Sequence, residues 1–345
     1  MHTVPVDLGK NKTEVCMKKF FSRALLLLLI PMLLSGCGPS PKEKVSAVGF
    51  YLDTVISIAA YGVKQEVVDD ALHKISEYEN LLSKTIEGSD VWNINHANGQ
   101  PVVVSDYTRE LLEASANTSV ATDGAFDITV GPSVALWDFK SETPSLPDKE
   151  KLAAAAALTD YTKITLEGNT VTMPAGMQID LGSIAKGYIT DEIAEYCRSR
   201  GVTCGILNFG GNVVVIGKRP DGKPWNVGIQ DPKEPTGQPL ITLPATDSAV
   251  VTSGIYERGF TRDGVRYHHI LEPKTGWPVQ NGLASVTLLT KDSLTADAYD
   301  TGLFVMGLEK AMALVEATPG MEAVFIDAED NIYYSSGLKQ LESQP

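Results

Sequence analysis

The chain has 345 residues, enough for one large domain or two ordinary ones, and its 43% hydrophobic and 21% charged residues are typical of a globular protein. Its formal net charge is −14 at pH 7, although residues 1–36 carry five lysines and arginines against two acidic residues. So acidic a body excludes non-specific binding of nucleic acid, because phosphate contacts need Lys and Arg. A phosphorylated ligand would need metal ions or backbone N–H groups to supply positive charge.

The N-terminus has the pattern of an export signal. From Met17 the chain has a basic start, a long apolar run and small residues before a cysteine. The segment Leu33–Cys37, LLSGC, matches a bacterial lipobox, in which Cys37 carries the lipid. An ordinary secretory signal and an uncleaved anchor helix are the alternatives. We predict a signal peptide over residues 1–36, with Met17 as the favoured start, and a flexible tether over 37–48 that anchors the protein to the membrane outside the cytoplasm.

Periodicity and turn residues predict the elements of the body. In chain order, the first half contains a strand over 50–62, helices over 64–83, 105–122 and 148–158, a hairpin over 163–173, a short strand over 177–183 and a helix over 184–201. The second half contains strands over 204–209, 212–217, 225–230, 248–254, 266–271 and 283–290, a helix over 294–307, and strands over 321–327 and 331–336. This order lacks strict βαβ alternation and predicts one continuous α+β body, with mixed or antiparallel sheets and packed helices.

Two cysteines lie in this body, near the end of a predicted helix and in the next strand. Cys197 and Cys204 fit no zinc-binding spacing. A disulfide outside the cytoplasm is possible, but two separate small core residues are favoured.

Two glycine-containing segments are candidate ligand loops. In TDGAFDITVGP (122–132), the glycines permit a tight backbone that could offer N–H groups and the carboxylate of Asp127, although a helix stop followed by a turn is favoured from the residues alone. In IDLGSIAKGY (179–188), a glycine and a small residue precede a helix, which suits an anion site with Lys186 one turn inside. A plain strand–helix turn explains the second segment equally well.

A third segment, SGIYERGFTRDGVRYHHILEPKTGWP (253–278), contains paired histidines in a predicted strand. His268 and His269 should therefore point to opposite faces, and one of them could accept a proton near neutral pH. A structural histidine is the more common case. Arg258 could simply coat the surface.

The fourth segment, LTADAYDTGLFVMG (294–307), is an apolar helix interrupted by polar residues. Spacings of three and four put Asp297, Asp300 and Thr301 on one face. Oxygen ligands without Cys or His suit a hard cation such as Mg²⁺, which takes one or two protein carboxylates and completes its shell with water and phosphate oxygens. Helix capping explains Asp297 but explains Asp300 and Thr301 less well, so we favour the metal site.

Taken in order, TDGAFDITVGP, IDLGSIAKGY, NFGGN, YHHILEPKTGWP, SVTLL and TADAYDTGLFVMG resemble the ApbE-type FAD:protein FMN transferases over residues 50–334. The resemblance implies a T-fold-like α+β domain, here 49–340, with FAD as substrate and Mg²⁺ as cofactor. It implies transfer of FMN, through a phosphoester, to a Ser or Thr in an Asp-(Ser/Thr)-Gly-Ala-(Ser/Thr) type motif of a partner protein, with release of AMP. The implied acceptors are redox-pump subunits and extracellular electron-transfer flavoproteins.

The resemblance also implies site residues. The metal ligands fall on Asp297, Asp300 and Thr301, joined by a backbone oxygen of Ser183, and His269 matches the family's recurrent histidine as general base. The flavin-contacting positions fall on Leu52, Thr85, Ala125, Phe126, Asp127, Asp180, Lys186 and Leu271.

Two departures from the family pattern bear on ligand affinity. Leu52-Asp53-Thr54 replaces Met-Gly-Thr, and KTIEGSDVWNIN (84–95) lacks the usual aromatic residue, so a stacking contact is either lost at Thr85 or supplied by Trp92. Two other functions share the same residues. One is an FAD pyrophosphatase that gives FMN and AMP, and the other is a non-catalytic, lipid-anchored flavin-binding protein.

Overall fold

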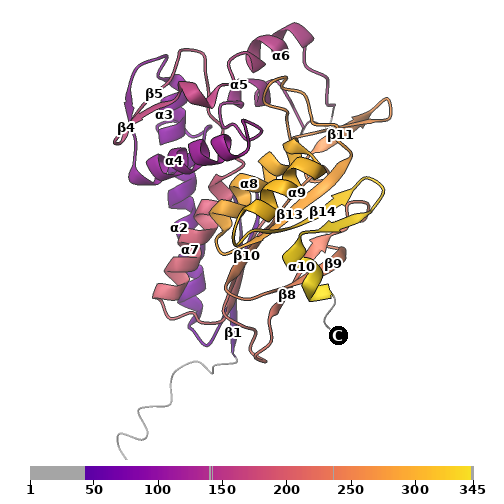
Figure 1. Ribbon diagram of the computed structural model, residues 1–345. Helices are drawn as coiled ribbons and strands as arrows, with labels where there is room; N and C mark the ends of the chain where they lie inside the picture. Colours follow the sequence, from indigo (N-terminus) through magenta and orange to yellow (C-terminus); the bar gives the residue numbers. More distant parts are fainter. Residues whose placement is uncertain (1–42, 140, 142, 236, 343–345) are drawn as a thin grey trace, which may run out of the picture.

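The computed structural model describes residues 43–342 apart from 140, 142 and 236 (Figure 1). The predicted signal peptide, Cys37 and most of the predicted tether lie outside the described residues. Within the described part, no helix is long and apolar enough to cross a membrane.

An eight-stranded antiparallel sheet forms the centre of the molecule, in the order β1-β2-β6-β7-β10-β13-β14-β15. Its strands are β1 Lys44–Tyr51, β2 Thr54–Tyr61, β6 Gly205–Phe209, β7 Asn212–Ile216, β10 Ser248–Gly254, β13 Leu283–Thr290, β14 Glu322–Asp327 and β15 Ile332–Tyr334. The central strand β13, LASVTLLT, is almost wholly buried because both faces of the sheet are covered there.

Helices cover one face of this sheet (Figure 1). These are α2 Gln65–Leu82, α7 Ala185–Ser199, α8 Ser293–Met306 and α9 Leu308–Ala317. The apolar stripe of α2 is buried against β1 and α7, and α8 lies across β10 and β13 beside α7. Asp292 caps α8 by accepting a hydrogen bond from the Thr295 N–H at 2.8 Å. This helical layer brings α7 and α8 into direct contact.

A hairpin covers part of the opposite face. It consists of β8 Trp225–Gln230 and β9 Pro239–Ala245, and α10 Ser336–Glu342 lies next to it. Val227, Ile229 and Leu243 pack on Val215 and Val250 of the central sheet. No described element packs on the outer face of the β1–β2 end, where Val48, Phe50 and Val55 are exposed.

The remaining elements gather beyond one end of the sheet, at the top of Figure 1. They are α3 Asp90–His96, α4 Asp106–Ala121, α5 Gly131–Val134, α6 Lys149–Ala156, the 3-10 turn Tyr161–Lys163, a small sheet of β3 Val102–Val103, β4 Thr165–Glu167 and β5 Thr170–Thr172, and the hairpin of β11 Gly259–Arg262 and β12 Val265–His268. Loops from this region face the helical layer and close the cavity described below.

The predicted α+β class is confirmed, and so are most predicted elements. Three details are wrong. The segment 50–62 is not one strand, because it turns at Leu52–Asp53 between β1 and β2. Residues 44–48 belong to β1 and not to the tether. Finally, 177–183 is not a strand but contributes an isolated bridge between Gln178 and Val130. Within the described residues both Cys197 and Cys204 are free, as favoured above.

Candidate functional site

A cavity of about 770 Å³ lies between the helical layer and the loops above it. Every site residue predicted within the body, with the exception of Asp300, lines this cavity: Leu52, Thr85, Ala125, Phe126, Asp127, Asp180, Ser183, Lys186, His269, Leu271, Asp297 and Thr301. Residues from six separate parts of the sequence thus meet in one place. Their individual roles stay predictions.

The crossing of α7 and α8 holds the first carboxylate. Asp297 is 2% exposed, and its oxygens accept hydrogen bonds from the Lys186 ammonium at 2.9 Å and the Gly187 N–H at 2.8 Å. A Cβ at Gly187 would lie 2.4 Å from the carbonyl oxygen of Ser293 and 2.6 Å from the Asp297 Cβ. Only glycine therefore lets the two helices approach so closely. The segment 179–188 is a turn into a helix whose first turn binds a carboxylate.

Asp300 lies behind the cavity wall, on the same helix. It is 1% exposed, its Oδ1 accepts a hydrogen bond from the Thr301 hydroxyl at 3.3 Å, and its Oδ2 is buried without a hydrogen-bond partner among the described residues. Burial, and then the charge of Asp297, raise the pKa of Asp300 well above its ordinary value. Two neighbouring buried carboxylates, one with an unused oxygen, are an arrangement that a cation would stabilise.

The donor set fits Mg²⁺. The described residues contain no group of three or more His, Cys, Asp or Glu placed to hold a metal ion. A site here would therefore consist of two carboxylates, the Thr301 hydroxyl and a backbone oxygen. Such a set of hard oxygen ligands, left partly open to the cavity, is the environment in which Mg²⁺ retains water or phosphate ligands.

The loop after α4 is organised by its own aspartate. Asp127 Oδ1 accepts hydrogen bonds from the N–H and hydroxyl of Thr129, and Oδ2 accepts one from the Tyr161 N–H at 2.9 Å. Burial raises the pKa of Asp127. The carboxylate thus fixes the backbone at Ala125 and Phe126, which line the cavity. The turn favoured from the sequence is present, and it forms part of the cavity wall.

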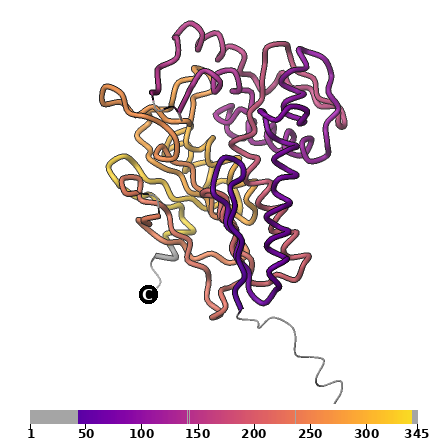
Figure 2. The backbone as a smooth tube through the Cα atoms, turned by 180° about the vertical axis from the view of Figure 1, so that it is seen from behind, coloured from indigo at the N-terminus to yellow at the C-terminus, as the bar shows by residue number. Residues whose placement is uncertain are grey.

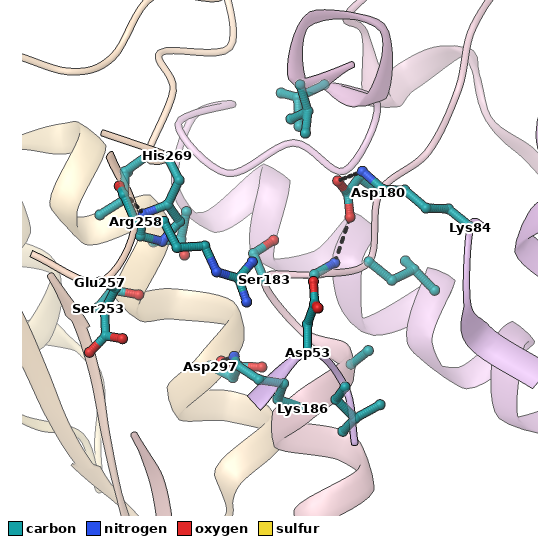
Figure 3. A pocket seen from close by; sticks show the side chains of 18 of the residues that line it. Asp53, Lys84, Asp180, Ser183, Lys186, Ser253, Glu257, Arg258, His269 and Asp297 are labelled. Atoms are coloured by element: carbon teal, nitrogen blue, oxygen red, sulfur yellow. Dashed lines mark hydrogen bonds and ion pairs between the residues drawn. The ribbon is translucent and has the colours of Figure 1, made fainter. Parts of the chain in front are cut away.

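The paired histidines face opposite ways, as predicted. His268 is 2% exposed; its Nε2 lies 2.8 Å from the carbonyl of Val279. His269 lines the cavity, with Nδ1 3.4 Å from the Arg258 carbonyl oxygen (Figure 3). When Nδ1–H donates to that carbonyl, Nε2 is left as the proton acceptor. Burial, then Arg258 and His268, lower the pKa of His269 to about 3, which keeps the ring neutral.

Several cavity residues were missed by the sequence reasoning. Figure 3 shows Lys84, Arg258 and Glu257 at the cavity with Asp180 and Lys186. The Lys84 ammonium lies 2.6 Å from an Asp180 oxygen, an ion pair between the end of α2 and the loop before α7. Arg258 does not simply coat the surface, and with Lys186 it brings positive charge into an acidic protein. Arg258 lies inside the segment 253–278, 11 residues before His269, and no local pattern sets it apart from the other arginines there.

Trp92 does not supply the missing aromatic contact. It does not line the cavity, and its ring stacks on His96 with the centroids 4.0 Å apart. Thr85 occupies the cavity wall, while the aromatic rings there belong to Phe50, Phe126, Trp137 and Phe139.

Comparison with known proteins identifies relatives of this chain. A sequence model of the ApbE family matches residues 52–325. A protein named FAD:protein FMN transferase from Klebsiella pneumoniae (strain 342) is 36% identical over 81% of this chain and 88% of its own length. Another of that name from Treponema pallidum (strain Nichols) is 35% identical over 79% of this chain and 80% of its own length.

Solved structures agree with the sequence relatives. The crystal structure of an ApbE protein from Thermotoga maritima superposes with a TM-score of 0.81 at 32% identity, covering 88% of this chain and all of its own. The flavin transferase ApbE from Vibrio cholerae gives a TM-score of 0.76 at 32% identity, covering 87% of this chain and 99% of its own. From the matched sequence and the shared fold, the chain belongs to the ApbE family.

Proposed function

We propose that this chain transfers the FMN part of FAD to a Ser or Thr hydroxyl of a target protein and releases AMP. The observation that carries the proposal is a single cavity lined by the oxygen-bearing side chains of Asp297 and Thr301, by three basic side chains and by the neutral His269. Its volume of about 770 Å³ lies in the usual range for sites that enclose a sizeable ligand. The printed names of the relatives support the same activity.

Asp297, Asp300, Thr301 and the backbone oxygen of Ser183 would hold Mg²⁺. Bound there, the ion supplies the Lewis-acid charge that neutralises a pyrophosphate. The chain contributes Lys186 and Arg258, two cations that can contact phosphate oxygens.

His269 is positioned to accept the proton of the acceptor hydroxyl. The hydroxyl oxygen attacks the phosphorus of the FMN half, and the bond from that phosphorus to the bridging oxygen breaks. The electron pair of the broken bond leaves with AMP, and the proton remains on the Nε2 of His269 until it is released. The fixed loop at Ala125 and Phe126 would hold the flavin side of the substrate during this exchange.

The proposed setting is the outer side of the cell membrane. Cys37 of the lipobox would carry the lipid, and the acceptors would be redox-pump or electron-transfer proteins with an Asp-(Ser/Thr)-Gly-Ala-(Ser/Thr) type motif. FAD and such an acceptor protein are thus the proposed partners.

The direct test is mass spectrometry of a motif-bearing acceptor after incubation with the protein, FAD and Mg²⁺. We expect the acceptor to gain the mass of FMN and AMP to appear in equal amount. Free FMN with an unmodified acceptor would mean a pyrophosphatase, and intact FAD would mean a binding protein. Asp297→Ala should abolish transfer in a folded protein, because it removes a carboxylate of the cation site. Glu309→Ala, at an exposed position on α9, is the control and should transfer normally.

A further inference from the structure

The outer face of the β1–β2 hairpin carries an exposed apolar strip. Val48 is 67% exposed, Phe50 68% and Val55 60%. Phe50 pairs directly with Val55 across the two strands, and Val48 lies two residues before Phe50 on the same face. The three side chains, called the hairpin strip below, are therefore neighbours. The other large apolar side chains exposed in the described part are scattered over β3, α4 and β12.

The hairpin strip borders the mouth of the cavity. Phe50 belongs both to the strip and to the cavity lining, which continues through Leu52, Asp53 and Thr54 of the hairpin turn. If a protein inserted one side chain into the cavity at this point, the residues on either side of that side chain would contact the hairpin strip.

The hairpin turn is strained but firmly held. Leu52 and Asp53 have positive φ angles of 51° and 65°, in the left-handed region that glycine favours. Non-glycine residues are strained in this region and occur preferentially at functional sites. The Leu52 N–H donates a hydrogen bond to Glu79 Oε1 at 2.9 Å. Thr54 packs closely on Gly210, since a Cβ added to Gly210 would lie only 2.1 Å from the Thr54 Oγ1. The strip is thus presented on a preorganised support, which lowers the entropic cost of binding.

Three possible occupants can be compared. A membrane is disfavoured because the predicted tether precedes Lys44, at the start of β1, whereas the turn lies at the other end of this strand (Figure 2). Eight residues at about 3.3 Å each place the turn roughly 25 Å from Lys44. A second copy of the chain is disfavoured because three side chains supply far less than the roughly 1,200–2,000 Å² of a stable interface. A small contact suits an encounter in which a modified product must leave again.

We propose that the hairpin strip is the docking surface for the acceptor protein, which it binds through an apolar segment beside the accepting Ser or Thr. This inference rests on the proposed function, since only a protein substrate requires a surface outside the cavity. The strip contains no charged residue, so its contribution to acceptor binding should change little with salt concentration.

The test uses the double variant Val48→Asp/Val55→Asp, because neither residue lines the cavity. With a folded redox-pump subunit that carries the motif as the probe, we expect the acceptor KM to rise about tenfold or more, the change produced by losing a typical apolar anchor. The kcat and the Kd for FAD, measured by flavin fluorescence, should stay unchanged. Val48→Ile/Val55→Ile should retain the wild-type KM because it keeps the strip apolar.

The matched control is Val103→Asp/Val120→Asp, which changes valines that are 76% and 68% exposed on β3 and α4. It should leave the acceptor KM unaltered. An unchanged KM in the hairpin variant would overturn the proposal. Two other results would also overturn it, if the hairpin variant kept the wild-type KM: loss of binding to phosphatidylglycerol vesicles, which would indicate a membrane, or loss of a dimer in light scattering, which would indicate a second copy of the chain. If the wild-type protein transfers no flavin, the proposed function fails, and direct titration of the same subunit against both double variants decides the docking surface.

Discussion

At the residue scale, His269 is distinguished from its neighbour by what each ring faces. His268 is enclosed by Val279 and Phe304 and has its Nε2 engaged, whereas His269 faces the cavity with Nε2 available. Both rings are kept neutral, because burial lowers the pKa of His268 to about 4 and that of His269 to about 3. A neutral ring leaves Nε2 of His269 without a proton, which is the form that a general base requires.

This environment predicts the pH dependence of transfer. A general base works unprotonated, so activity is lost as the pH falls through its folded-state pKa, here about 3 and not the ordinary 6.5. At saturating Mg²⁺, which would hold the buried Asp300 ionised, we expect kcat/KM for FAD to be nearly flat from about pH 8 to about pH 5 in an initial-rate profile. An acid limb centred near 6.5 would show that the His269 pKa is not lowered. His269→Gln should lose most of the rate at every pH, whereas Lys291→Gln, on the exposed loop before α8, should not.

The site residues that the sequence predicts are those with a local pattern. Asp297 and Thr301, four apart on a helix, do share the face that lines the cavity. Asp300 shares the helix but lies behind that face, fully buried. Lys84 and Arg258 belong to no periodic pattern, and their part in the site depends on which distant segments the fold brings beside them. No local rule could have identified them.

At the element scale, Gly187 sets how closely α7 and α8 can cross. Gly187→Ala would place a methyl group within 2.4 Å of the Ser293 carbonyl oxygen, so the helices must separate and Asp297 must move. Although alanine favours helix formation, we expect the overpacking to lower the free energy of unfolding by about 1–3 kcal/mol and to impair transfer. Urea unfolding measures the first effect. Glu195→Ala, at an exposed position of the same helix, should change stability little, and a Gly187→Ala protein as stable as the wild type would contradict the close crossing.

Elements with clear boundary signals were predictable, and those without them were not. The α2 helix has an apolar stripe and α8 has a capping aspartate, and both were identified. The β1–β2 turn was missed because Leu52 and Asp53 are not residues that signal a tight hairpin turn. The α9 helix was not predicted as a separate helix, because only Gly307 separates it from α8. The strand β9 was not predicted either, because its two prolines argue against a strand.

At the scale of the whole molecule, the proposed anchor makes a prediction about location. Under the proposed function, a lipid on Cys37 would attach the chain to the membrane. We expect Cys37→Ser, expressed in a bacterium that processes lipoproteins, to move from the membrane pellet to the soluble fraction on ultracentrifugation. Cys16→Ser, before the favoured start at Met17, is the control. A Cys37→Ser protein that stays in the pellet would exclude the lipid anchor.

The overall architecture follows from the sequence to a considerable extent, because irregular mixing of strands and helices already predicts an α+β body. The strand order does not follow, since β2 pairs with β6 across nearly 150 residues of intervening chain and no periodicity encodes that partner. The acidic composition was equally uninformative about the cavity, where two cations from distant segments meet.

The ion pair of Lys186 and Asp297 has a consequence for how such a protein matures. If the chain is exported as proposed, it would fold where divalent ions are not guaranteed, and the Lys186 ammonium already balances the buried Asp297 carboxylate at 2.9 Å. With the lysine as counterion, the fold needs no metal to balance the charge of Asp297. Binding of the proposed Mg²⁺ would then exchange one cation for another and would free the Lys186 side chain for the phosphates of the proposed substrate.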